Sequence, residues 1–329
     1  MNDRIGMKKG VLQDMASLLE VRDLKKYFKT KLGLLHAVDD VTFSLDAHKT
    51  LGVVGESGCG KTTLGRTILH LTEPTSGQIL FDGVDASNPT KKELFELRKK
   101  MQIIFQDPLS SLNPRMSLSE SIMEPLVLCG GITKKDMQKK VRQMMDTVGI
   151  ASRFEHSYPH ELDGGTRQRI GIARALVLNP KFIVCGEPVS ALDVSIQAQI
   201  INLLLDLQEE LGLAYMFVTH DLSVVKYISD DIMVMYLGQM VEKAPAEELF
   251  SNTRHPYSKA LLSAVPIPSV HNKKQRIILK GELSSPINPK PGCRFAPRCR
   301  FASDECLKPQ IIEECAPGHF VSCCKYKEL

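Results

Sequence analysis

One short segment constrains the fold of this chain more than any other, the run TLGVVGESGCGKTTLGRTILHL from Thr50 to Leu71. Its residues 55–62 match the pattern GxxxxGK[ST], after a continuous apolar stretch and before an expected helix that begins at Gly60. Glycines in such a loop let backbone N–H groups surround phosphate oxygens, and the helix N-terminus adds partial positive charge. The alternative is a glycine-rich turn that fits the pattern by chance, but the strand–loop–helix context favours nucleotide binding.

Two side chains of this loop have a specific expected role. Lys61 is expected to reach the β- and γ-phosphates, and the Thr62 hydroxyl is expected to bind Mg²⁺. The residues expected to surround the nucleotide here are Gly55, Glu56, Ser57, Gly58, Cys59, Gly60, Lys61, Thr62 and Thr63.

The pattern of apolar residues on both sides of the loop predicts an α/β protein. Strand-like segments dominate residues 18–83, whereas residues 108 to about 178 carry little strand signal and several helical stretches. Strands and helices then alternate again up to a last helix in HPYSKALLSAVP. A strand–helix core interrupted in this way indicates an α/β sheet with an inserted helical subdomain.

Composition excludes several classes of protein. Apolar residues make up 43% of the 329 residues and charged residues 24%, which is the balance of a soluble globular protein. The net charge of +4 is mild, and the lysines are scattered along the chain rather than clustered. We therefore expect no nucleic-acid partner. We recognise no signal peptide and no apolar run near the ~18 residues of a membrane helix. The chain is therefore expected to be cytosolic, with any membrane role exerted through a partner.

Further motifs follow in a fixed order. Gln106 lies in IIFQDP at the end of a strand, and the segment LDGGTRQR contains Asp163, Gly164 and Gly165. Glu187 follows the apolar strand KFIVC, Asp193 ends the segment SALD, and His220 lies in FVTHD. Each motif alone is weak, but in this order and spacing the chain resembles the ABC-type ATPases. The resemblance covers nearly the whole chain.

The resemblance implies a fold and a set of roles. The fold is a RecA-like P-loop ATPase core with a β-rich edge subdomain, a helical insertion and a Cys-rich C-terminal extension. The implied boundaries are a tail at 1–17, a nucleotide-binding domain at 18–262 with its helical part at about 108–178, and an extension at 263–329. Glu187 is the implied general base, Gln106 is implied to contact the metal or the attacking water, and His220 matches the family's switch histidine. Tyr27 occupies the place of the aromatic residue that stacks on adenine.

The family also implies an assembly. Two chains enclose ATP, with the phosphate loop of one protomer facing the LDGGT-type signature of the other. Segments such as VVGESGCGKTT and HPYSKALLSAVP resemble the ATP-binding subunits of oligopeptide and dipeptide importers, and SSLNPR resembles their F-type subunit. The implied partners are a D-type ATP-binding subunit, two membrane-spanning permease subunits and a peptide-binding protein outside the membrane. The implied location is the cytoplasmic side of the membrane.

The sequence leaves alternative functions open. Nickel importers share many of these sequence motifs. The motifs therefore define the class of transporter better than they define the transported substrate. A non-transport ABC protein is disfavoured because such proteins usually carry two cassettes or a long coiled insertion. A regulatory partner that binds nucleotide without hydrolysing it is the remaining alternative.

The sequence departs from the family at two site positions. Gly186 stands where the family carries an aspartate that positions Mg²⁺, so the metal would depend on Thr62, Gln106, phosphate oxygens and water. Asp163 stands where the family carries a serine, and a carboxylate facing the γ-phosphate is unfavourable. Asp163 is instead expected to cap the following helix. A heterodimer with unequal sites, an active enzyme that tolerates both changes, and a defect in this chain remain open.

The cysteines are unevenly distributed. Six of the nine lie within the last 37 residues, and such clustering in a reducing compartment favours metal ligation over disulfides. The tail of the peptide-importer ATPases is similar to a four-cysteine site that holds an iron–sulfur cluster, which implies Cys293, Cys299, Cys306 and Cys323 as ligands. Four thiolates fit either [4Fe–4S] or Zn²⁺, and four reduced thiols are the third possibility. Cys324 could substitute for Cys323, and Cys315 is surplus.

Overall fold

The computed structural model of the chain describes residues 17–189, 192–265, 276–279, 281 and 285–328. The expected N-terminal tail, apart from Ser17, therefore lies outside the described residues, and so do Ser190 and Ala191 of the segment SALD.

An eight-stranded sheet forms the centre of the molecule, with the strand order β11-β12-β10-β9-β3-β8-β7-β6. Every residue of β3 and β8 is buried, which explains why these strands read as continuous apolar runs rather than as alternating patterns. The parallel strands are β3 (Thr50–Val54), β6 (Met101–Ile104), β7 (Phe182–Gly186), β8 (Ala214–Val218) and β9 (Asp231–Tyr236). The antiparallel strands β10 (Gln239–Pro245), β12 (His319–Val321) and β11 (Glu313–Ala316) extend this sheet beyond β9.

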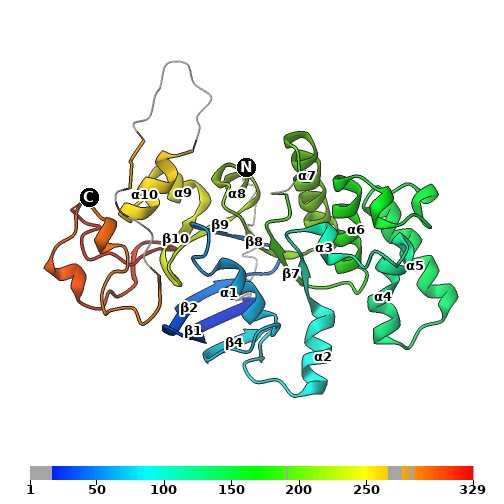
Figure 1. The fold of residues 1–329 in the computed structure, drawn as a ribbon, viewed down its shortest axis with the longest axis horizontal. Helices are drawn as coiled ribbons and strands as arrows, with labels where there is room; N and C mark the ends of the chain where they lie inside the picture. Colours follow the sequence, from blue (N-terminus) through cyan, green and yellow to red (C-terminus); the bar gives the residue numbers. More distant parts are fainter. Residues whose placement is uncertain (1–16, 190–191, 266–275, 280, 282–284, 329) are drawn as a thin grey trace, which may run out of the picture.

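A second, antiparallel sheet of four strands lies beside the first, in the order β2-β1-β4-β5. In the second half of β2, buried Val41, Phe43 and Leu45 alternate with exposed residues, as expected for a sheet with one solvated face. Helix α1 (Lys61–Ile68) contacts strands of both sheets, and its buried residues share one core with them. Figure 1 shows the helix beside β1 and β2. The strands are β1 (Leu19–Thr30), β2 (Gly33–Leu45), β4 (Ser76–Phe81) and β5 (Val84–Asp85).

Helices occupy the chain between β6 and β7. They gather at one end of the molecule, away from the C-terminal segment (Figure 1). Side-chain caps define where three of them begin, because Ser117, Thr133 and Asp163 each accept a hydrogen bond from a backbone N–H of the first turn. These helices are α3 (Pro108–Ser111), α4 (Leu118–Cys129), α5 (Lys134–Thr147) and α6 (Gly164–Leu176).

Five further helices complete the fold of the described residues. They are α2 (Lys91–Lys100), α7 (Val194–Leu211), α8 (Leu222–Ile228), α9 (Ala246–Ser251) and α10 (Pro256–Ser263). Of these, α8 contacts β3 and α9 contacts β9 and β10. Within the part of the chain that the structure describes, none of the helices combines the length and the apolar character needed to cross a membrane.

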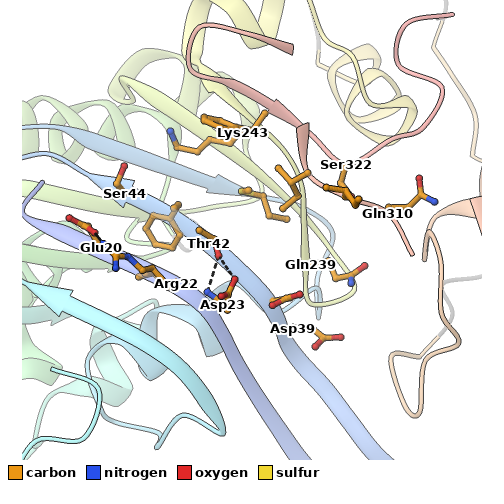
Figure 2. Close-up of a pocket in the computed structure, with 17 residues that line it drawn as sticks. Glu20, Arg22, Asp23, Asp39, Thr42, Ser44, Gln239, Lys243, Gln310 and Ser322 are labelled. Carbon is orange, nitrogen blue, oxygen red and sulfur yellow. Dashed lines mark hydrogen bonds and ion pairs between the residues drawn. The ribbon is translucent and has the colours of Figure 1, made fainter. Parts of the chain in front are cut away.

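The C-terminal segment folds back onto both sheets. Beyond joining the central sheet through β12, it pairs with β2, where His36 N donates to the Pro286 carbonyl at 2.9 Å and Leu35 forms a bridge with Ile287. A cavity of about 630 Å³ lies between β1 and β2 on one side and β10 and the C-terminal segment on the other. Figure 2 shows Asp39 and Gln239 along this cavity, with Gln310 and Ser322 on its C-terminal wall.

Candidate functional site

The phosphate loop follows β3 and has the backbone shape that its glycines permit. Gly55 and Gly60 have φ values of 151° and 104°, which side-chain-bearing residues rarely adopt. A Cβ at Gly60 would also collide with the Ala37 carbonyl oxygen. The buried Lys61 ammonium donates to the carbonyl oxygens of Gly55 at 2.8 Å and Glu56 at 3.1 Å. The loop is therefore held open around a lysine that can exchange these carbonyls for phosphate oxygens.

A cavity of about 530 Å³ opens above this loop, a size typical of sites for small molecules. Six residues of the phosphate loop and α1 line it, together with side chains that follow three other strands of the central sheet. Because β3, β6, β7 and β8 are parallel, their carboxyl ends meet at one edge, where ligand sites of such sheets lie. The lining residues are Phe28, Leu35, Ala37, Ser57, Gly58, Gly60, Lys61, Thr62, Thr63, Gln106, Glu187, His220 and Pro286.

The three predicted catalytic side chains meet at this edge. The Gln106 amide donates to Glu187 Oε2 at 2.9 Å, and His220 Nδ1 lies 3.3 Å from the same oxygen. Glu187 itself has a φ of 49°, a left-handed conformation that is uncommon for a residue with a side chain. Its backbone N–H donates to the Val218 carbonyl at 2.9 Å. A carboxylate held between an amide and an imidazole beside a phosphate loop can accept a proton from water.

Gly186 ends β7 immediately before Glu187. A Cβ at this position would lie 3.4 Å from the Ile104 carbonyl oxygen and 3.9 Å from Gln106 N, which are ordinary van der Waals distances. The glycine is therefore not imposed by lack of space, and its absent carboxylate leaves Glu187 as the acidic residue among those that line the cavity.

The aromatic residue at the cavity differs from the sequence prediction. Phe28 lines the cavity with Leu35, whereas Tyr27 does not. The Tyr27 hydroxyl donates to the Asp39 carboxylate, and its ring stacks on His36 with centroids 3.9 Å apart. Neighbouring residues of a strand point to opposite faces, so only one of these two rings faces the cavity. Phe28 rather than Tyr27 therefore lines this cavity, a residue that the sequence prediction did not single out.

Asp163 caps helix α6. Its carboxylate accepts from Thr166 N at 2.8 Å and from the Thr166 hydroxyl at 2.7 Å, and these bonds lower the pKa of Asp163 below its usual value. Asp193 caps α7 in the same way, accepting from Ser195 N and Ile196 N. Asp163, Gly164, Gly165 and Asp193 do not line the cavity above the phosphate loop. They lie at the N-termini of α6 and α7, where the first backbone N–H groups of a helix have no partner within the helix.

Three residues of the phosphate loop also face away from the cavity. Gly55, Glu56 and Cys59 are absent from its lining, and the Glu56 carboxylate pairs with Arg298 of the C-terminal segment. Cys59 is buried, with its Sγ 3.8 Å from the Lys61 ammonium.

The four predicted cysteine ligands line one small cavity. Cys293, Cys299, Cys306 and Cys323 all face it, but its volume of about 10 Å³ has room for roughly one water molecule. Burial raises the pKa of Cys293 to about 11, so this thiol carries its proton at neutral pH. Within the described ranges, no three His, Cys, Asp or Glu side chains are arranged to hold a metal ion. The donors fit an iron–sulfur cluster in kind, but their present spacing does not.

Two family models match the chain. The one described as "ABC transporter" matches residues 38–190, and the one described as "Oligopeptide/dipeptide transporter, C-terminal region" matches residues 241–306. The oligopeptide transport ATP-binding protein AppF of Bacillus subtilis is 52% identical over 322 residues, which covers 94% of this chain and 98% of AppF. The dipeptide transport ATP-binding protein DppF of Haemophilus influenzae is 47% identical over 319 residues, covering 95% of this chain and 98% of DppF.

Solved structures share the same fold. The ATP-binding cassette MJ0796, determined as a dimer bound to ADP and Pi, matches with a TM-score of 0.64 at 27% identity, covering 69% of this chain and 98% of that chain. The cbiO1 protein of Clostridium perfringens, part of the cbiONQ transporter complex, matches with a TM-score of 0.64 at 28% identity, covering 71% of this chain and 91% of that one.

Proposed function

The chain belongs to the ABC transporter family of ATP-binding proteins and is an ATPase of that family, and from this membership we propose that it powers the import of oligopeptides or dipeptides. The observation that carries the proposal is the convergence of Gln106 and His220 on the Glu187 carboxylate beside the phosphate loop. That arrangement supports ATP hydrolysis, and the peptide importers AppF and DppF match over nearly the whole chain.

We assign the binding of ATP to residues that line the cavity. Lys61 would leave the Gly55 and Glu56 carbonyls for the β- and γ-phosphates, while backbone N–H groups of residues 57–63 surround their oxygens. Phe28 would stack on the adenine ring. Thr62 and Gln106 offer the oxygens that suit Mg²⁺, which would draw charge from the phosphates.

Hydrolysis would proceed by general-base catalysis. Glu187 would accept a proton from the attacking water once the nucleotide displaces its contact with Gln106. Gln106 and His220 would then orient that water and sense the γ-phosphate. Glu187 lies at the end of a buried strand, so its carboxylate has a defined position relative to the phosphate loop.

The site requires a second chain. The relative MJ0796 is a dimer, and we propose that this chain pairs with a D-type ATP-binding subunit. Asp163, Gly164 and Gly165 at the start of α6 would face the nucleotide of that partner, with Asp193 near the contact. Two membrane-spanning permease subunits and a peptide-binding protein would complete the importer, and this chain would lie on the cytoplasmic side of the membrane.

We propose that the two sites of this pair are unequal. Gly186 supplies no carboxylate for Mg²⁺ at the site formed by this phosphate loop, which weakens hydrolysis there. Asp163 places a negative charge near the partner's nucleotide, although its capping of α6 turns the carboxylate toward Thr166. A regulatory chain that binds ATP but does not hydrolyse it is the second candidate, which Gly186 favours.

The chain is divided into an ABC domain and a C-terminal extension. We propose an ABC domain at 18–262, whose helical subdomain at about 108–178 docks on the permease subunits, and a C-terminal extension at 263–329. The cysteines of the extension are proposed to hold a [4Fe–4S] cluster after the cavity between them opens. Iron, sulfide and visible absorption in anaerobically purified protein would support this assignment, and their absence would remove it.

Affinity purification of the tagged chain from solubilised membranes tests the proposed function. We expect two integral membrane proteins and a second ATP-binding chain to co-purify, and the complex to hydrolyse ATP in a Mg²⁺-dependent manner. Recovery of the chain alone, or with proteins of another class, would contradict the proposal.

A further inference from the structure

The phosphate loop of this chain contains a carboxylate. Glu56 follows Gly55 directly, in a segment whose backbone is shaped to surround phosphate. A negative charge beside a bound polyphosphate is unfavourable, particularly where burial limits the screening by water. A nucleotide site that retains this residue therefore needs a cation close to it.

The C-terminal segment supplies that cation. Arg298 Nη1 donates to Glu56 Oε2 at 2.9 Å and to Glu56 Oε1 at 3.1 Å, and it lies 3.4 Å from the Tyr236 hydroxyl. Only 11% of the Arg298 side chain and 26% of the Glu56 side chain is exposed. The pair is thus largely shielded from water, unlike a surface ion pair. Its two opposite charges therefore interact more strongly than those of an exposed pair.

The loop that carries Arg298 is itself anchored. Phe295 is buried against the rings of Tyr236 and Tyr257, with centroids 5.3 and 5.4 Å away. The Tyr257 hydroxyl in turn accepts a hydrogen bond from Glu56 N at 2.9 Å. Arg298 and Tyr257 therefore fix the phosphate loop through the side chain and the backbone of Glu56, respectively.

A second arginine of the same loop contacts β2 and the turn that follows β9. Arg294 donates to the Asp39 carboxylate and to the Leu237 carbonyl. Although burial alone would raise the pKa of Asp39, hydrogen bonds from Tyr27 and His36 and the charge of Arg294 hold it below the usual value. Asp39 N also donates to the Gly238 carbonyl, and Gly238 N donates to the Cys59 carbonyl of the phosphate loop, both at 2.8 Å.

We propose that loop 293–299 is a positioning element of the nucleotide site, in which Arg298 neutralises Glu56 and so makes the phosphate loop competent to bind ATP. The proposal rests on the nucleotide site described above. Arg298 is a positioning residue, because it acts on the phosphates through Glu56 and does not line the cavity. The C-terminal extension is thereby coupled directly to ATP affinity.

Binding of ATP with Mg²⁺ to the purified full chain, measured by calorimetry, tests the proposal. Arg298→Gln is expected to weaken ATP binding roughly tenfold, within the usual range for coupled sites. The double substitution Arg298→Gln with Glu56→Gln is expected to restore the affinity, since the uncompensated charge is removed. Arg300→Gln is the matched control, because Arg300 is an exposed arginine of the same segment whose guanidinium lies over Phe301.

The outcomes distinguish a failure of the positioning role of Arg298 from a failure of the proposed function. Unchanged ATP affinity in Arg298→Gln, or a double variant as weak as the single one, would overturn the positioning role. If thermal unfolding shows that Arg298→Gln is not folded, the single variant Glu56→Gln provides the test. We expect Glu56→Gln to bind ATP at least as tightly as the wild type. A loss of ATP affinity in this variant would overturn the positioning role. If the wild-type chain binds no ATP, the proposed function falls, and the inference with it.

Discussion

The side chains of Gln106 and Glu187 are joined by a hydrogen bond of 2.9 Å between the amide nitrogen and the carboxylate, across 81 positions of the chain. Gln106 follows β6 and Glu187 follows β7, which are neighbouring parallel strands. The bond holds the proposed base beside the phosphate loop and links it to the helices that begin just after Gln106. Movement of those helices would therefore alter the position of Glu187 in the site.

Restoring a carboxylate at position 186 is expected to increase hydrolysis. The backbone accommodates a Cβ there without close contact, so Gly186→Asp should fold and offer Mg²⁺ a further ligand. We expect the Mg²⁺-dependent ATPase rate of the assembled complex to rise by roughly tenfold, which corresponds to about 1.4 kcal/mol of transition-state stabilisation. Gly186→Asn, similar in shape but uncharged, is the control. An unchanged rate and Mg²⁺ requirement would count against unequal sites.

Substitutions of Asp163 should separate its capping role from its charge. Asp163→Ser retains an oxygen that can cap α6, so the stability should hold while the ATPase rate of the complex rises. Asp163→Ala removes the cap and is expected to lower the free energy of unfolding by ~1 kcal/mol. Urea unfolding and ATPase assays of both variants give the two readouts. Equal rates in the wild type and the serine variant would show that the charge does not reach the partner's nucleotide.

The two neighbouring aromatic residues of β1 are expected to behave differently. Phe28→Ala should weaken ATP binding by about 1–3 kcal/mol, the usual contribution of one base–aromatic stack. Tyr27→Phe removes the hydroxyl that donates to Asp39; it should leave ATP affinity unchanged and cost ~1 kcal/mol of stability. Equilibrium binding of ATP to each variant is the measurement. The reverse pattern would return Tyr27 to the nucleotide.

His255 is expected to make the fold sensitive to acid. Burial lowers its pKa to about 4 in the folded chain, against about 6.5 for an exposed histidine. Between these values the unfolded chain binds more protons, so the free energy of unfolding falls as the pH falls. His255 Nδ1 accepts from Tyr257 N at 3.1 Å, a contact that asparagine can replace.

Urea unfolding at pH 7 and pH 5 provides the test of this titration. Between these two pH values the wild type should lose about 2 kcal/mol more stability than His255→Asn. Comparing the losses cancels any cost of the substitution itself. Equal losses in both proteins would exclude His255 as the titrating group.

Much of the site was predictable from local pattern. The phosphate loop, Gln106, Glu187 and His220 each follow an apolar run, and parallel strands bring such ends together at one edge. The cap formed by Asp163 was also predictable, because an acidic residue directly before a helix has one favourable local role.

Two features could not be predicted from local pattern. The choice between Tyr27 and Phe28 depends on which face of β1 turns toward the loop, and the pairing of β1 with β2 shifts register between Lys26 and Tyr27. The contact of Arg298 with Glu56 spans 242 positions. A carboxylate in a phosphate loop does signal that a cation is needed, but sequence alone does not say which of many arginines provides it.

Uptake of a labelled oligopeptide by cells that lack this chain tests the central claim most directly. We predict that deletion abolishes uptake, that the wild-type chain restores it, and that Glu187→Gln does not, because the amide cannot accept the proton of the attacking water. Nickel uptake measured in parallel should remain unchanged. Normal peptide uptake in the deleted cells, or loss of nickel uptake in its place, would contradict the account.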